Sequence, residues 1–353
     1  MSKSKKLILM IGPHILGKGG ISSVINNYKA SGLFVEENIS YISTWIEGSF
    51  IRRQIHFLLS ILKILIKFTT CNVKVIHIHV AQRGSFYRKA LIIRISKLFS
   101  VPVILHLHAS EFDKFYGGSN NFLQSIIRSI LAKCDVIICL SESWAHYIKQ
   151  IQPIAKTQIL NNYVVPIKPK PSTPKIYDLL FLGRIGARKG LFDLLDVIRN
   201  DLDHLENIKI AVGGDGDVDE LFSYINSNNL QKQVEYVGWI TGEQKEQLIH
   251  SSRFVILPSY GEGMPMSLLE AMSAGVPIIA TNVGGIPSLI THGKSGFIFE
   301  PGDKEALKAI IFSIMDNKID EAQMGIESLA LYNQKYSPEI VLNLLSNIYK
   351  KFN

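Results

Sequence analysis

The chain alternates short apolar runs with longer segments whose apolar residues recur at helical spacing. Glycine, proline or polar residues bound the apolar runs, and this pattern is typical of strands that are buried on both faces. Strands that alternate with helices along a chain form parallel sheets. The runs that we interpret as strands cover residues 6–11, 73–80, 101–108, 136–140, 157–164, 177–182, 208–212, 234–237, 254–257 and 276–280. The pattern therefore predicts an α/β protein that is built on parallel sheets.

A cluster of prolines divides the chain near its middle. Four prolines within nine residues exclude a helix or a central strand, so this segment is predicted to be a linker. They are Pro166, Pro169, Pro171 and Pro174. A chain of 353 residues is long enough for two domains of ordinary size. We predict an N-terminal domain over residues 1–165, a linker over residues 166–175 and a C-terminal domain over residues 176–337.

Residues 51–68 are predicted to form a helix with a wide apolar face. Its polar side chains form a narrow and largely basic stripe of Arg52, His56, Ser60, Lys63 and Lys67. Two interpretations remain open, a helix that lies in a membrane surface and a helix that packs on the sheet of the N-terminal domain. No uncharged apolar segment reaches the ~18 residues that a membrane span needs. The N-terminal residues 1–12 predict a first strand and not a signal peptide.

Charge is distributed unevenly along the chain, whose net charge is +8. Residues 1–170 contain 22 Lys and Arg against 7 Asp and Glu, whereas residues 171–353 contain 16 against 23. A strongly basic half predicts a polyanionic partner, either a membrane with acidic lipids or a phosphate-bearing acceptor. Nucleic acid is not favoured as the partner, because the sequence has no stacking aromatic motif or recognised nucleic-acid-binding fold.

Neither the cysteines nor the histidines predict a metal site. The cysteines are an odd number without a CxxC pair, which is typical of free thiols in a reducing cytosol. They are Cys71, Cys134 and Cys139. Two HxH pairs, His77 with His79 and His106 with His108, place alternate side chains on one face of a strand, which permits chelation. No acidic or cysteine partner lies at a useful spacing, so we predict no metal.

A glycine-containing loop between an apolar strand and a helix carries the clearest site pattern. The strand ends at Leu257, and a helix is predicted to begin near Pro265, because proline suits the first helical position. Free N–H groups at such a helix entrance bind anions. Glu262 in the loop and Glu270 on the helix flank this entrance, and their carboxylates are suited to accept hydrogen bonds from sugar or ribose hydroxyls. In isolation they would be ordinary charges, but parallel sheets bind ligands at such strand ends.

The turn GRIGARKG, which follows the predicted strand 177–182, carries two further candidates. Arg184 and Lys189 flank glycines just before a predicted helix, and two cations at the end of a strand suit a diphosphate. In isolation they would be solvated charges. Opposite the helix entrance near Pro265 they would complete a diphosphate clamp.

The segment PSYGEGMPMSLLEAMSAGVPIIAT, residues 258–281, closely resembles the donor-site signature of the retaining glycosyltransferases of family 4. The turn GRIGARKG is similar to the phosphate-binding pattern GRxxxxKG of the same family. The resemblance extends over almost the whole chain, with looser motifs in the first domain. It implies the GT-B fold, in which two Rossmann-like parallel-sheet domains face a central cleft and the last helix, here residues 338–353, packs back on the first domain.

The resemblance also implies roles for individual residues. Glu262 would contact the hexose hydroxyls, Glu270 the ribose hydroxyls, and His108, in the motif HLHAS, the donor sugar or its phosphate. Arg184 and Lys189 would hold the diphosphate and stabilise it as it leaves. The glycine loop after the first strand lacks the GxGxxG spacing of a dinucleotide site and would lie near the donor phosphates. The remaining donor-binding candidates are Gly19, Gly20, Gly263, Met264, Pro265, Met266 and Ser267, with Trp239 and Ile240 beside the nucleotide base.

We therefore expect a retaining glycosyltransferase that moves a hexosyl or N-acetylhexosaminyl group from a nucleotide diphosphate sugar, with a UDP-sugar favoured. The basic half favours a polyprenyl-diphosphate-linked glycan as acceptor, at the inner face of the cytoplasmic membrane, in capsule, O-antigen (lipopolysaccharide) or exopolysaccharide assembly. We expect no cofactor and no metal, because Arg184, Lys189 and a helix dipole stabilise the leaving diphosphate. The alternatives are a nucleotide-sugar epimerase or a sugar phosphorylase on the same fold, and a non-catalytic nucleotide-sugar-binding subunit.

Overall fold

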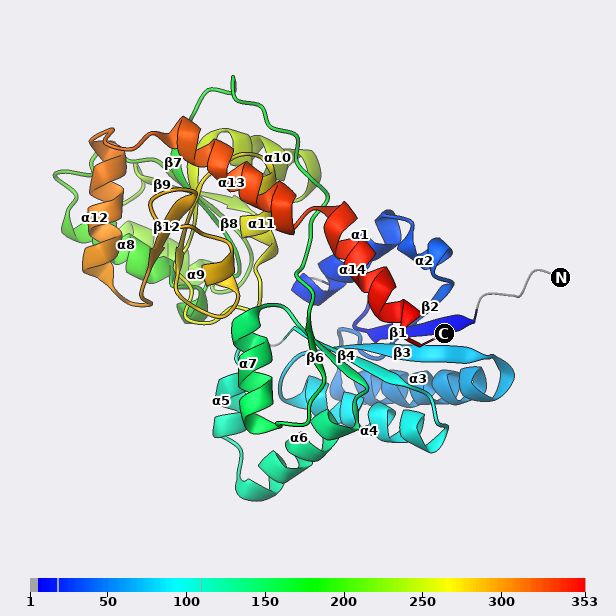
Figure 1. Cartoon of the computed structure of the whole chain (residues 1–353). Helices are drawn as coiled ribbons and strands as arrows, with labels where there is room; N and C mark the ends of the chain where they lie inside the picture. The colour runs from blue at the N-terminus through cyan, green and yellow to red at the C-terminus, as the bar shows by residue number, and fades with distance from the viewer. Residues whose placement is uncertain (1–5, 18, 109, 353) are drawn as a thin grey trace. The chain divides into compact units, whose positions relative to one another are not determined.

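The computed structural model describes residues 6–17, 19–108 and 110–352, and the chain divides into two compact units. Unit 1 comprises Met1–Tyr163 together with Pro338–Asn353, and unit 2 comprises Val164–Ser337. Each unit has its own sheet with helices on both faces (Figure 1).

Unit 1 is built on a six-stranded sheet in the order β2-β1-β3-β4-β5-β6, in which all neighbouring strands are parallel. Its strands are β1 (Leu7–Gly12), β2 (Ile39–Ser43), β3 (Val73–Val80), β4 (Val103–Leu107), β5 (Val136–Cys139) and β6 (Thr157–Ile159). Its helices are α1 (Gly20–Ala30), α2 (Leu33–Glu36), α3 (Phe50–Thr70), α4 (Gly84–Leu98), α5 (Phe112–Gly117), α6 (Asn121–Lys133), α7 (Glu142–Ile151) and α14 (Pro338–Lys350).

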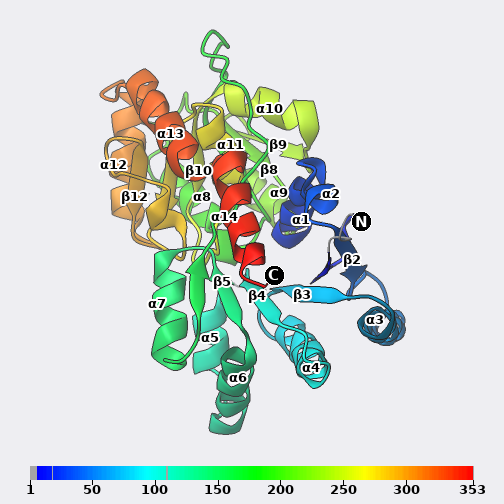
Figure 2. The same ribbon diagram turned by 45° about the vertical axis from the view of Figure 1, so that its right-hand side comes forward.

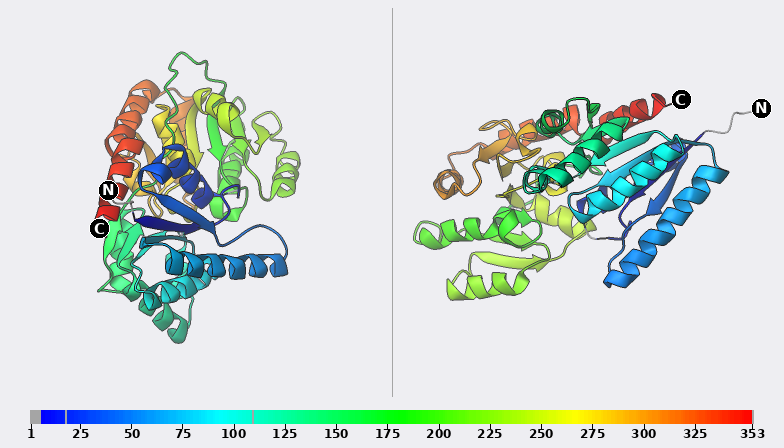
Figure 3. Two further views of the ribbon diagram at one scale, coloured as in Figure 1. Left: turned by 90° about the vertical axis from the view of Figure 1, so that its right-hand side faces the viewer. Right: turned by 90° about the horizontal axis from the view of Figure 1, so that it is seen from below.

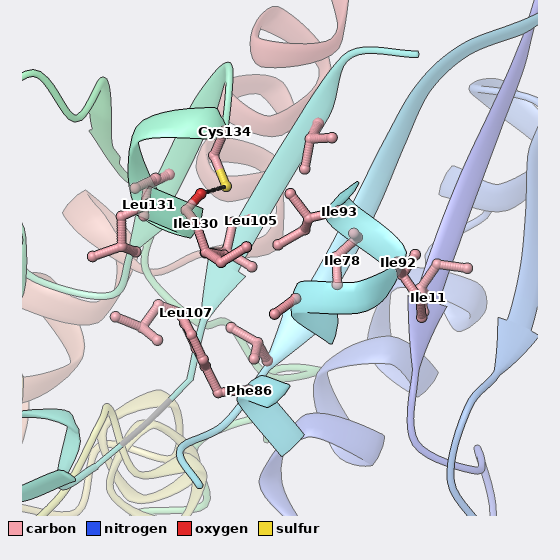
Figure 4. Packing of buried hydrophobic residues seen from close by; sticks show 14 of the residues in the cluster. Ile11, Ile78, Phe86, Ile92, Ile93, Leu105, Leu107, Ile130, Leu131 and Cys134 are labelled. Atoms are coloured by element: carbon pink, nitrogen blue, oxygen red, sulfur yellow. Dashed lines mark hydrogen bonds between the residues drawn. The ribbon is translucent and has the colours of Figure 1, made fainter. Parts of the chain in front are cut away.

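The two faces of the unit 1 sheet carry different side chains. On one face, alternate residues of β3 such as Ile78 form an apolar cluster with residues of α3, α4 and α6. Figure 4 shows this packing around Ile78, Leu105 and Ile93. On the other face, His77 contacts Tyr349 of α14 and His79 contacts Tyr28 of α1. Figure 2 shows α1 and α14 on the opposite side of this sheet from α4 and α6.

Unit 2 repeats this architecture with the strand order β12-β11-β10-β7-β8-β9, again with parallel neighbours. Its strands are β7 (Tyr177–Leu182), β8 (Ile210–Gly213), β9 (Val234–Gly238), β10 (Ser252–Leu257), β11 (Ile278–Thr281) and β12 (Gly296–Phe299). Its helices are α8 (Leu191–Asn200), α9 (Val218–Ser227), α10 (Gly242–His250), α11 (Met266–Ser273), α12 (Lys304–Met315) and α13 (Glu321–Lys335), with short 3₁₀ helices η1 (Ala187–Lys189) and η2 (Ile286–Ser288).

The α/β prediction is confirmed, and the predicted strands 73–80 and 177–182 have the bounds of β3 and β7. The helix predicted to begin near Pro265 starts at Met266, with Pro265 as its extended N-cap. The strand predicted at 157–164 is too long, because β6 ends at Ile159. Strands β2 and β12 were not predicted; both lie at sheet edges, where half-exposed residues interrupt the apolar run.

Helix α3 buries Phe57 and Ile64 in the apolar cluster but leaves many of its other apolar side chains exposed to solvent. Two residues of the predicted polar stripe face the sheet edge: His56 Nε2 lies 3.0 Å from the Ser43 carbonyl oxygen, and Ser60 Oγ donates to the same oxygen. Arg52 and Lys63 of the same stripe are exposed. The exposed apolar side chains are between 50% and 69% accessible and comprise Phe50, Ile51, Ile55, Leu58, Leu59, Leu62 and Ile66. In the described part of the chain, no helix is both long enough and apolar enough to cross a membrane.

Candidate functional site

The two loops that carry the predicted donor site are neighbours at the carboxyl edge of the unit 2 sheet. Strand β7 pairs with β8 on one side and with β10 on the other, so the strand order reverses between β7 and β10. Open parallel sheets bind ligands at such a switch point. The loop after β7 holds Arg184 and Lys189, and the loop after β10 holds Glu262, so the topology alone brings these candidates together.

Backbone contacts fasten the two loops to each other. Tyr260 N donates to Arg188 O at 2.9 Å, and Arg188 Nη1 donates to Gly261 O at 2.9 Å. Gly190 has a φ of +66°, and a Cβ there would lie 1.9 Å from the Pro258 carbonyl oxygen. Only glycine allows so close an approach in this conformation. The relative position of Lys189 and Glu262 is therefore set by the backbone and not by flexible side chains alone.

Lys189 and Glu262 form a buried ion pair. Lys189 Nζ lies 2.5 Å from Glu262 Oε1, and their side chains are 14% and 7% exposed. Ser259 Oγ donates to the same carboxylate oxygen at 2.7 Å. A buried pair with an added hydrogen bond holds both charges in place, and separating it leaves one charge unsatisfied. An anion that binds Lys189 would replace this partner, and hydroxyl groups would then satisfy Glu262.

Arg184 is the free cation of the turn. It is exposed, and within residues 6–17, 19–108 and 110–352 its guanidinium has no hydrogen-bond or ion-pair partner. Its turn is held by Ile185 N, which donates to Asp215 O at 2.6 Å, and by the close contact of Gly216 with the Ile185 carbonyl. An available guanidinium on a fixed turn can bind two oxygens of a phosphate at once.

The entrance of helix α11 offers backbone donors. Pro265 is its N-cap and provides no capping side chain, so the first N–H groups of the helix lack a side-chain acceptor. Gly263, Met264 and Pro265 are buried, whereas Met266 and Ser267 are half-buried. Uncapped N–H groups at a helix start favour an anion.

Glu270 has a partner that the sequence did not reveal. Lys245 of α10 lies 2.5 Å from Glu270 Oε1. Burial raises the pKa of the Glu270 carboxyl, and the Lys245 ammonium opposes this rise. The predicted ribose contact of Glu270 is therefore to a carboxylate that is already paired. Lys245 has no motif around it, so only the fold could show this pair.

Trp239 and Ile240 lie after β9, two strands away from β7 in the sheet. Two backbone hydrogen bonds link their loop to the turn of Arg184 through the end of β8. Gly214 N donates to Gly238 O, and Gly183 N donates to Gly213 O. The Trp239 ring is 48% exposed. The roles of both residues beside a nucleotide base stay predictions.

In unit 1, the predicted site residues lie at the carboxyl edge of its sheet. Gly19, with a φ of +148°, is the N-cap of α1, and Gly20 is its first residue; both are exposed. His108 follows β4, and its Nε2 lies 2.8 Å from Nδ1 of His79. His108 is therefore hydrogen-bonded to a member of a larger group of histidines.

Four histidines of β3 and β4 form a continuous group of rings. Besides the contact between His79 and His108, His77 Nε2 lies 3.2 Å from His106 Nδ1, and His77 Nδ1 lies 2.6 Å from the Tyr349 hydroxyl. Burial lowers the pKa of His77 and His108 to about 3 and that of His79 and His106 well below the usual value. All four imidazoles are therefore neutral near pH 7.

Three of these histidines have nitrogens that could reach one metal ion. The donor atoms of His77, His79 and His106 lie within 4.8 Å of one another, and Nε2 of His79 and His106 has no hydrogen-bond partner among the described residues. Tetrahedral zinc with bonds of ~2.0–2.1 Å places its ligand atoms about 3.3 Å apart. In this structure the rings pair with one another by hydrogen bonds and stacking.

Sequence reasoning missed three residues of the donor-side loops. Ser259 binds Glu262, Arg188 binds Gly261 O, and Lys245 binds Glu270. Ser259 and Arg188 lie inside the quoted motifs, so their position was a usable signal. The sequence gives no comparable signal for Lys245.

Two family profiles match successive parts of the chain. Residues 31–165 match the profile described as Glycosyltransferase Family 4, and residues 166–328 match that described as Glycosyl transferases group 1. A 2-deoxystreptamine N-acetyl-D-glucosaminyltransferase of Niallia circulans is 25% identical over 79% of this chain and 76% of its own length. The UDP-Gal:alpha-D-GlcNAc-diphosphoundecaprenol alpha-1,3-galactosyltransferase of Escherichia coli is 25% identical over 69% of this chain and 67% of its own. The match to the amylovoran biosynthesis glycosyltransferase AmsK of Erwinia amylovora covers 58% of that protein.

Solved structures share the fold over nearly the full length. A sucrose-phosphate synthase from Thermosynechococcus elongatus superimposes with a TM-score of 0.82 at 16% identity, covering 98% of both chains. Anabaena Alr3699/HepE in complex with UDP-glucose gives a TM-score of 0.76 at 17% identity, covering 98% of this chain and 99% of that one. The two parallel sheets, the paired donor-side loops and both profiles agree, and the chain belongs to the group 1, family 4 glycosyltransferases with the two-domain GT-B fold.

Proposed function

We propose that this glycosyltransferase moves a hexosyl or N-acetylhexosaminyl group from a UDP-sugar to a glycan acceptor with retention of anomeric configuration. The observation that carries the proposal is the buried Lys189–Glu262 pair at the β7/β10 switch point, next to the uncapped entrance of α11. The site offers cations and backbone N–H groups that can bind a diphosphate, and beside them a carboxylate that can accept hydrogen bonds from sugar hydroxyls. One relative named for transfer from UDP-Gal and a structural neighbour solved in complex with UDP-glucose support the donor class.

Each group has a defined part in the proposed reaction. Arg184 and Lys189 bind the diphosphate, and their charge with the α11 dipole stabilises the negative charge that develops as the bond between the anomeric carbon and the phosphate oxygen breaks. Glu262 accepts hydrogen bonds from the hexose hydroxyls and fixes the orientation of the ring. The acceptor oxygen attacks from the face that the diphosphate leaves, and the departing phosphate takes the acceptor proton. No metal enters this scheme.

A panel of UDP-, GDP- and ADP-sugars tests the donor class. We expect a UDP-sugar to raise the melting temperature and to be hydrolysed slowly without acceptor, because binding to the native state alone stabilises it. The matched control is Lys318→Ala, which removes an exposed lysine of unit 2. Stabilisation should persist in that variant and disappear in Glu262→Ala. If no nucleotide sugar stabilises the wild-type chain more than Glu262→Ala, the proposal fails, and analysis of the product separates transfer from epimerase or phosphorylase activity.

The acceptor is proposed to be a lipid-linked glycan of a cell-surface polysaccharide, reached at an acidic membrane surface. The exposed apolar face of α3 and the basic charge of residues 1–170 support this. A helix that carries aliphatic side chains outward with Lys and Arg along its edges suits the boundary between headgroups and acyl chains.

Flotation with vesicles tests the membrane contact. Wild-type protein is expected to float with phosphatidylglycerol vesicles, and Leu58→Glu with Leu62→Glu should abolish flotation because two charges enter the apolar face of α3. The control, Ile326→Glu, alters an exposed apolar residue of unit 2 that is 61% accessible. Equal flotation of the α3 variant and the control would contradict the proposal.

A further inference from the structure

Three basic side chains of unit 1 lie near the starts of two helices. Arg53 is in the first turn of α3, and Arg88 and Lys89 are in the second turn of α4. Because α3 follows β2 and α4 follows β3, both helices begin at the carboxyl edge of the sheet, the edge at which such sheets bind ligands. Both helices cover the same sheet face (Figures 1 and 3).

Lys89 is buried without a counter-charge. Its side chain is 2% exposed, and within the residues that the structure describes its ammonium has no hydrogen-bond or ion-pair partner. Burial, reinforced by the charge of Arg88, lowers the pKa of Lys89 to about 7. A lysine this buried is normally paired, because an unpaired charge in a protein interior is costly. A bound anion would supply the partner that this ammonium lacks.

The two arginines are similarly unsatisfied. The buried Nε atoms of Arg53 and Arg88 have no acceptor among the described residues. The Arg88 side chain folds back over the first turn of α4, since its Nη1 lies 3.4 Å from where a Cβ on Gly84 would be. Arg53 and Arg88 lie near the starts of the two helices that cover the same face of the sheet. Burial, together with the positive charge of Arg53, lowers the pKa of Arg88. Neither helix has an acidic residue in its first turn.

We propose that Arg53, Arg88 and Lys89 bind a phosphate or diphosphate group at the carboxyl edge of the unit 1 sheet. Two guanidiniums, one ammonium and the start of α4, which has no capping side chain, supply donors and positive charge to such an anion. Buried polar groups nearly always have partners, so the unpaired donors mark the place of an absent acceptor.

The surroundings indicate that this anion carries a hydrocarbon chain. The exposed apolar residues Phe50 and Ile51 lie within one turn of Arg53 and begin the exposed face of α3. A polyprenyl diphosphate and an acidic phospholipid both combine these chemistries. The identification with the diphosphate of a lipid-linked acceptor rests on the proposed function, whereas the anion site does not.

Inorganic pyrophosphate is the probe for the anion site. Calorimetric titration uses the whole chain with Arg184→Gln, Lys189→Met and Glu262→Gln, so that the side chains of the donor clamp of unit 2 cannot contribute. We expect binding, and we expect Arg88→Gln to weaken it ~10-fold or more, since a hydrogen bond to a charged group contributes ~1.5–3 kcal/mol. The control Arg94→Gln removes the same charge from an exposed position of α4. Absence of binding, or equal weakening by both substitutions, would overturn the site.

Lys89→Met separates binding from a structural role. Methionine fills a similar volume without the charge, so the free protein should melt at the same or a higher temperature while its stabilisation by pyrophosphate is lost. A lower melting temperature with an intact response to pyrophosphate would show that Lys89 only supports the fold and would contradict the assignment.

Two further probes distinguish the sources of the anion, geranyl diphosphate in solution and phosphatidylglycerol vesicles with phosphatidylcholine vesicles as reference. If Arg88→Gln weakens the binding of geranyl diphosphate alone, the site is assigned to a prenyl diphosphate. If it weakens the binding of acidic vesicles alone, the site is assigned to a lipid headgroup. Unchanged binding of both probes overturns the proposal. UDP-sugar hydrolysis is measured in parallel with the single variant Arg88→Gln, which keeps the unit 2 site intact. Absence of hydrolysis would count against the proposed donor and not against the anion site.

Discussion

Substitution of Lys189 by methionine is expected to lower kcat/KM for sugar transfer ~10²- to 10³-fold. The ammonium lies at the switch point where the donor diphosphate would acquire charge, and removal of one such electrostatic group typically has an effect of this size. The fall should appear in kcat as well as in KM, because leaving-group charge grows toward the transition state. Steady-state kinetics with the UDP-sugar identified by the panel measure it.

Loss of activity in this variant has a second possible cause, since Glu262 becomes a buried unpaired carboxylate. The double variant Lys189→Met with Glu262→Gln removes both charges and should recover most of the thermal stability that the single variant loses. Activity should stay low in the double variant. Recovery of activity together with stability would show that the pair serves the fold and not the reaction.

Acidification from pH 7 to pH 5 is expected to destabilise unit 1 by several kcal/mol. Each of the four buried histidines has a pKa below the unfolded value of about 6.5, and for His77 and His108 it is about 3. Between these values the unfolded chain binds more protons than the folded one, so the free energy of unfolding falls as pH falls. The contribution is ~2 kcal/mol for each histidine over this interval, as an order of magnitude.

Tryptophan fluorescence can follow this loss in unit 1 alone. Trp45 and Trp144 belong to unit 1 and Trp239 to unit 2, so the variant Trp239→Phe reports unfolding of unit 1 by urea. His79→Asn should reduce the fall in the free energy of unfolding between pH 7 and pH 5 by the contribution of one histidine. His146→Gln, at an exposed position of α7, should leave that fall unchanged. A free energy of unfolding that is constant between pH 7 and pH 5 would contradict the assignment of neutral buried imidazoles.

The hydrophobic pattern was sufficient for the central strands and insufficient at the sheet edges. Strands such as β3 are buried on both faces, so their apolar runs are continuous and their bounds are visible in the sequence. The edge strand β2, with only Ile42 fully buried, has no such run. Helix α3 was misleading in another way, because His56 and Ser60 bind the backbone of β2 while many apolar side chains of the helix remain exposed. Side-chain polarity alone does not say which face of a helix is covered.

The candidate site was predictable where motif and topology coincide. Glu262 and Lys189 were chosen from separate motifs, and the β7/β10 neighbourhood joins them. Their direct pairing was not foreseen, because each had been assigned to a different part of the substrate. Lys245 and the unpaired Arg53, Arg88 and Lys89 depend on long-range packing and burial, which single-sequence patterns do not encode.

The return of α14 to unit 1 makes that unit discontinuous in the chain. Tyr349 covers His77 only after residues 164–337 have been synthesised, whereas every strand of unit 2 comes from one uninterrupted segment. On the ribosome, unit 2 can therefore fold as soon as it emerges, whereas His77 of unit 1 stays uncovered until α14 has been synthesised. Loss of α14 would leave His77 uncovered, and a chain with such an exposed surface is expected to be bound by chaperones or degraded by proteases.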